Sequence, residues 1–188
     1  YQLASGLSQD VETDDNVFRQ TTARLPWLLI GMLGGIGNSM ILGNFDSTFA
    51  AHPEMALYIP LIGGTGGNVG TQSSALVVQG LANSSLNAEN TFKQVLKESV
   101  VALINATIIS MLVYIYNFIR FGATATVSYS VSISLFAVVM FASIFGTLVP
   151  MTLEKLKVDP AIATGPFISI TNDIIGMMMY MGITVLLS

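Results

Sequence analysis

The sequence contains no cysteine and a single histidine, His52. The missing cysteines exclude disulfides, thiolate metal sites and cysteine nucleophiles. One histidine is too few for a histidine-rich zinc or copper site within one chain. Since no nucleophile–base pair or metal-activating cluster is visible, no catalytic residue or bound cofactor is expected, and an enzyme is not predicted.

Charged residues are also few. They make up 10% of the chain, against about 25% in a typical soluble domain. The 11 acidic and 7 basic residues give a net charge of −4, which gives no support to nucleic-acid binding and argues for cations over anions as partners.

The few charges are segregated. Uncharged runs cover residues 25–45, 55–88, 99–119 and 121–153, and the stretch after Asp159 contains only Asp173. Each run can cross a hydrocarbon core of about 30 Å, which needs about 20 helical residues. The sequence therefore predicts an all-α membrane protein with five transmembrane helices. Residues 25–188 form the membrane domain, and residues 1–24 are a cytoplasmic linker or connecting helix.

The basic residues predict the orientation. Six of the seven fall in three places that share one side of a five-span protein, and only Arg120 falls on the other. Because Lys and Arg accumulate in cytoplasmic loops, we expect a multi-pass protein of the cell membrane with a cytoplasmic N-terminus and an external C-terminus. Those six are Arg19, Arg24, Lys93, Lys97, Lys155 and Lys157.

Asp173 is the strongest functional signal. It stands alone in a largely apolar run that starts at Pro160. A carboxylate at the centre of a span costs at least a few kcal/mol, so it normally faces water or a bound cation. Ser169 and Gly176 are one helical turn away on the same face, and small neighbours leave room for a hydrated ion. Asp173 is therefore the predicted metal site.

A glycine-rich segment, residues 63–70, interrupts the second predicted span. Each glycine costs nearly 1 kcal/mol relative to alanine in a helix, so a regular helix is not expected there. The segment either lines a pore, with Asn68 and Gln72 supplying side-chain oxygens, or packs closely against a neighbouring span. In the first span, Gly31 and Gly35 form a small-x-x-x-small pattern, which favours helix packing.

Prolines mark the predicted ends of the last two spans. Pro150 is expected to kink or end the fourth span. Asp159 is a good N-cap and Pro160 suits a first helical position, so the fifth span is expected to begin there. Gly165 and Pro166 then predict a kink.

Two parts of the sequence resemble the MgtE family of magnesium channels. Pro60 and the run from Gly66 to Ser73 are similar to the family's glycine motif. The segment from Asp159 to Ala161, Pro166, and Asp173 followed by Gly176 resemble its last span. The resemblance covers residues 18–188.

This resemblance implies a homodimeric Mg²⁺ channel whose pore follows the two-fold axis and is lined by the second and fifth spans. The residue matching Asp173 is the family's central metal site, the one matching Asn68 lies near the pore, and those matching Gly165 and Ser169 contribute around the site. A hydrated Mg²⁺ ion is usually held by one or two carboxylates and waters, which two copies of Asp173 would supply.

The chain departs from the family in two respects. The family often has Asn where this chain has Gly165, so we expect a side-chain contact to be missing and the ion discrimination to differ from that of relatives. Cytosolic regulatory domains usually precede the family's membrane part, and none is found in this sequence. The ranking of Mg²⁺ against Mn²⁺, Co²⁺, Ni²⁺ and Zn²⁺ stays open.

Two alternatives remain. A cation-coupled secondary transporter of divalent metals also uses broken helices and a midplane carboxylate, but the spans hold only one acid and no internal repeat is visible. A non-transporting membrane subunit would need a cation on another chain to pair with Asp173.

Overall fold

The computed structural model describes residues 6–122, 124–163 and 165–187. These residues form helices and connecting segments, and no strand occurs among them. The long helices are α1 (Val17–Gly43), α3 (Ile59–Ala82), α4 (Thr91–Phe121), α5 (Thr126–Lys155) and α6 (Pro166–Leu187). The short elements are α2 (Asp46–Ala51) and the 3-10 turns η1 (Pro53–Tyr58), η2 (Ala88–Asn90) and η3 (Pro160–Ala163).

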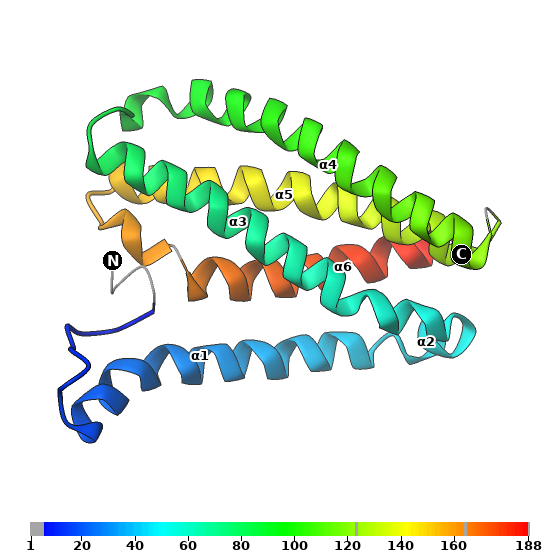
Figure 1. Cartoon of the computed structure of the whole chain (residues 1–188), viewed down its shortest axis with the longest axis horizontal. Helices are drawn as coiled ribbons and strands as arrows, with labels where there is room; N and C mark the ends of the chain where they lie inside the picture. The colour runs from blue at the N-terminus through cyan, green and yellow to red at the C-terminus, as the bar shows by residue number, and fades with distance from the viewer. Residues whose placement is uncertain (1–5, 123, 164, 188) are drawn as a thin grey trace.

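The five long helices run lengthwise in one bundle (Figure 1). Helix α5 packs against α3, α4 and α6, while α3 also packs against α6. Helix α1 stands at one edge, where α6 is its main partner, and α4 stands at the opposite edge. The core therefore lies around α5, and α1 and α4 leave most of their apolar side chains exposed.

Among the described residues, four helices are long and apolar enough to cross a membrane, by length and composition: α1, α4, α5 and α6. Helix α3 lacks charged residues and has 24 residues, or about 36 Å at 1.5 Å per residue. Its glycines and polar side chains keep it out of that group of four. The prediction of an all-helical protein is confirmed, whereas the apolar signal supports four spans of the predicted five.

The glycine-rich segment forms a regular helix, so of the two expectations for it, departure from a helix is wrong and close packing against a neighbouring span is observed. Helix α3 continues through residues 63–70 without a break. A Cβ atom on Gly66 would lie 2.8 Å from Val138 Cγ1, and one on Gly70 would lie 2.7 Å from Ile168 Cγ2. The glycines thus allow α5 and α6 to approach the backbone of α3, and this packing compensates for their low helix propensity.

The last helix starts later than predicted, and Pro150 does not end the fourth span. Pro150 lies inside α5, which continues to Lys155. Helix α6 begins at Pro166 and not at Pro160, because Gly165 has a φ of 61°, which is not a helical conformation and separates η3 from α6. Asp159 does act as a cap, since its Oδ1 accepts a hydrogen bond from the Ala161 N–H at 3.0 Å, but it caps the short turn η3.

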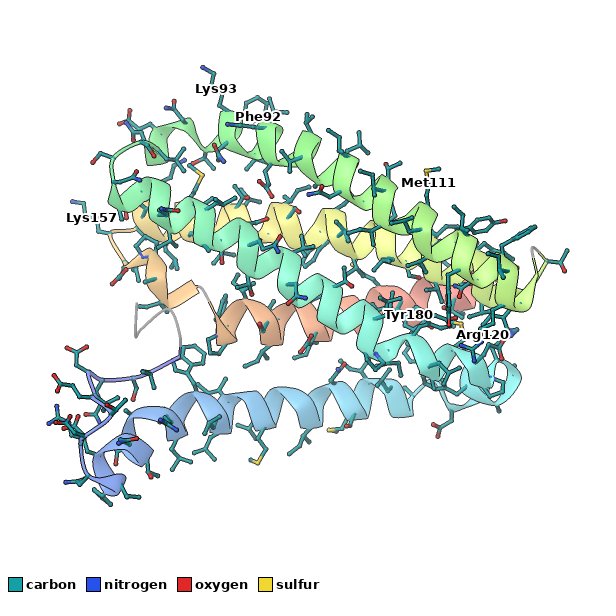
Figure 2. All side chains as sticks on the ribbon, in the orientation of Figure 1. Phe92, Lys93, Met111, Arg120, Lys157 and Tyr180 are labelled. Atoms are coloured by element: carbon teal, nitrogen blue, oxygen red, sulfur yellow. The ribbon has the colours of Figure 1, made fainter. Side chains whose placement is uncertain are left out.

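Polar side chains tie the helices together at the end of the bundle where α3 begins. The Tyr180 hydroxyl donates a 2.7 Å hydrogen bond to the Met55 carbonyl, and Tyr180 lies inside the bundle (Figure 2). The buried Tyr58 hydroxyl donates to Asn117 Oδ1. These bonds join η1 to α6 and α4, so they fix the entry of α3 into the bundle.

Candidate functional site

Asp173 lies seven residues after the start of α6 and is partly buried. Helix α6 packs between α3 and α1. The carboxylate therefore has two neighbouring walls, one from each of these helices. Both walls are made largely of glycine.

The α3 wall brings backbone close to the carboxylate. A Cβ atom on Gly63 would lie 3.3 Å from Asp173 Oδ1. One on Gly67 would lie 4.0 Å from the same oxygen and 3.9 Å from Ser169 Oγ. The predicted shared face of Asp173 and Ser169 is thus observed, and it is turned toward the glycines of α3.

The α1 wall encloses a small cavity of about 70 Å³ beside the carboxylate. Asp173 and Ile170 of α6 line one side of it. Gly31, Gly34, Gly35 and Asn38 of α1 line the other side. The expected packing of the first span therefore occurs, but the close contact is at Gly34, where a Cβ atom would lie 2.5 Å from Ile170 Cγ2, and not at Gly35.

Asp173 has no counter-charge within the described part of the chain. Its carboxylate forms neither an ion pair nor a hydrogen bond with another described residue. The described residues also contain no group of three or more His, Cys, Asp or Glu side chains that could hold a metal ion. The described part of one chain therefore offers a single carboxylate in a small-residue surrounding.

The other predicted site residues are spread around this centre. Asn68 and Gln72 are exposed, one turn apart on α3, on a different face from Gly63 and Gly67. Gly165 precedes α6 at the end of the bundle. Gly176 is buried against α5, where its Cβ would lie 3.6 Å from Val138 Cγ1.

Two asparagines near this centre were not singled out from the sequence. Asn38 Oδ1 is buried beside the cavity, and both polar atoms of the Asn172 side chain are buried against α3; none has a hydrogen-bond partner among the described residues. An amide within an uncharged run is a detectable signal. The neighbours of Asn38 and Asn172 depend on how α1 and α3 pack against α6. The sequence does not predict this packing.

Comparison with known proteins agrees with these features. Residues 59–183 match the MgtE family, described as a divalent cation transporter. The Magnesium transporter MgtE of Bacillus subtilis is 32% identical over 183 residues, which cover 97% of this chain and 40% of that protein. The protein of the same name from Thermus thermophilus is 33% identical over 165 residues, 88% of this chain and 36% of that protein.

The Magnesium transporter MgtE of Enterococcus faecalis is 28% identical over 172 residues, covering 92% of this chain and 38% of that protein. The chain thus spans about two fifths of the length of these curated relatives. The family match covers α3 to α6, including the glycine-rich segment and Asp173. The chain therefore belongs to the MgtE family of divalent cation transporters.

Proposed function

We propose that this chain is the membrane-spanning part of a Mg²⁺ channel, in which a largely hydrated ion passes the Asp173 carboxylate. The observation that carries the proposal is a carboxylate in the middle of an apolar helix with no counter-charge in the described chain. Such a group is costly in lipid unless it meets water or a cation. The relatives named as magnesium transporters favour Mg²⁺ as that cation.

The working unit is a homodimer in this proposal. Asn68 and Gln72 are exposed on α3, and amides that face lipid are unfavourable within a span. A second copy that covers this face would shield the amides from lipid, and the homodimer would supply a second Asp173 carboxylate to the ion path. Asn68, Gln72, Gly165 and Ser169 would then surround the pore, and Gly176, packed against α5, would keep the helix slim one turn beyond Asp173.

Five spans and a cytoplasmic N-terminus complete the arrangement. Helix α3 runs between the same two ends of the bundle as the four apolar helices (Figure 1). Lys93 and Lys157 lie at one end and Arg120 at the other (Figure 2), as the preference of basic residues for the cytoplasmic side requires. A cysteine at position 93 that reacts only from outside the cell would contradict this orientation.

The outer face of α4 suits contact with membrane lipid. Its exposed side chains are mostly apolar, and Phe92 and Met111 project outward from the bundle (Figure 2). This face and the four apolar helices agree with a multi-pass protein of the cell membrane.

Mg²⁺ flux into liposomes tests the proposal against its alternative, a cation-coupled secondary transporter. A channel conducts far above ordinary enzyme-like turnover of about 1–10³ per second, and it needs no proton or sodium gradient. We expect rapid Mg²⁺ entry driven by the Mg²⁺ gradient alone, with Mn²⁺, Co²⁺, Ni²⁺ and Zn²⁺ compared in the same assay. Slow entry that requires a second ion gradient would favour the transporter.

A further inference from the structure

The cavity between α1 and α6 contains a polar group that the proposed function does not use. Asn38 Oδ1 is buried at its wall and has no hydrogen-bond partner among the described residues. A buried amide oxygen without a partner is unfavourable. In native proteins such groups normally contact ordered water or a ligand.

The packing of α1 against α6 explains why Asn38 lies beside Asp173. The two helices run in the same direction (Figure 1). They are in close contact at Gly34 and Ile170, where a Cβ atom on the glycine would lie 2.5 Å from the isoleucine Cγ2. One turn further along each helix are Asn38 and Asp173, and both border the same cavity.

The cavity has room and partners for water. Its volume of about 70 Å³ corresponds to about two waters at roughly 30 Å³ each. Asn38 Oδ1 and an ionised Asp173 are both hydrogen-bond acceptors. A water between them would donate one hydrogen to each, so its oxygen would be free to face a cation.

We propose that Asn38 is an ion-binding residue of the ion path, which binds the hydrated cation through a water shared with Asp173. Helix α1 then forms part of the path beside α3 and α6. The proposal rests on the proposed function, because it assumes that a hydrated divalent ion reaches Asp173. It adds a second, neutral acceptor for the ion's waters in the same cavity as the carboxylate.

Mg²⁺ flux through Asn38→Leu protein in liposomes tests this role. Leucine has a similar size and removes the acceptor oxygen. The Mg²⁺ concentration for half-maximal flux should rise by about threefold to tenfold, the factor that one neutral hydrogen bond contributes. Asn38→Asp keeps an acceptor and should preserve or lower that concentration. Asn105→Leu removes an exposed amide of α4, away from the cavity, and should leave it unchanged.

A second measurement tests the role of Asn38 even if Asn38→Leu protein does not fold. Because the chain has no cysteine, Asn38→Cys provides a single thiol. A small water-soluble thiol reagent should modify it, and Mg²⁺ should slow the modification. An unreactive thiol, or flux in Asn38→Leu equal to that of the original protein, would overturn the proposal.

Mg²⁺ flux through Asp173→Asn protein, measured in the same assay, distinguishes failure of the role of Asn38 from failure of the proposed function. If it loses Mg²⁺ flux while Asn38→Leu behaves like the original protein, only the role of Asn38 fails. If Asp173→Asn conducts normally, the proposed function itself fails.

Discussion

Asp173→Asn is expected to abolish Mg²⁺ flux while leaving the protein folded and assembled. Asparagine keeps the shape of aspartate but removes one negative charge from each copy. At an effective dielectric constant of about 20, two unit charges 4 Å apart attract by about 4 kcal/mol, and a divalent ion doubles that value. Since 1.4 kcal/mol is a tenfold change in affinity, at least about a hundredfold loss of flux at limiting Mg²⁺ should follow.

Flux in liposomes and the oligomeric state in detergent measure this effect together. Asp46→Asn is the matched control, because it makes the same substitution at an exposed position of α2. The control should conduct normally. Normal Mg²⁺ entry through correctly inserted Asp173→Asn protein would contradict the proposal that the ion path passes along α6.

Gly146→Val is expected to cause the largest loss of stability. Gly146 is a buried residue of α5, and a Cβ atom there would lie 2.7 Å from the Gly70 carbonyl oxygen and 3.1 Å from Ser73 Cβ. The backbone oxygen has no rotamer that avoids the contact, so α3 and α5 would have to separate. Overpacking of this kind costs about 1–3 kcal/mol or more.

Thermal or denaturant unfolding in detergent measures the change in the free energy of unfolding. Gly182→Ala is the control, because among the described residues no atom beyond its chain neighbours and its own helix backbone lies within 4 Å of a Cβ atom at Gly182. Its stability should change by less than about 1 kcal/mol. If Gly146→Val unfolds like the control, close contact between α3 and α5 does not stabilise the bundle.

Uncharged runs were sufficient to predict the helices, because a membrane span needs only length and apolar composition. The centre of the last helix was also predictable, since Asp173 is conspicuous in a run without other charges. Helix α3 was harder to predict. Glycine propensities describe a helix in water, and they omit the packing of Val138, Ile168 and Asn172 against the α3 backbone.

The surroundings of Asp173 were less predictable than Asp173 itself. The face of α1 that carries Gly31, Gly34 and Asn38 follows from helical spacing. Its partner does not, because many helix pairings are compatible with the same pattern. The start of α6 depended on the positive φ of Gly165, a backbone conformation that glycine permits but does not require.

The position of a bound divalent ion tests the central claim most directly. The measurement is a crystal structure of the assembled protein from crystals grown with Mn²⁺. The anomalous scattering of Mn²⁺ locates the ion. The account predicts one Mn²⁺ peak between two Asp173 carboxylates, with metal–oxygen distances beyond the roughly 2.1 Å of direct Mg²⁺ ligation. A fully occupied Mn²⁺ site elsewhere in the spans, with none at Asp173, would contradict it.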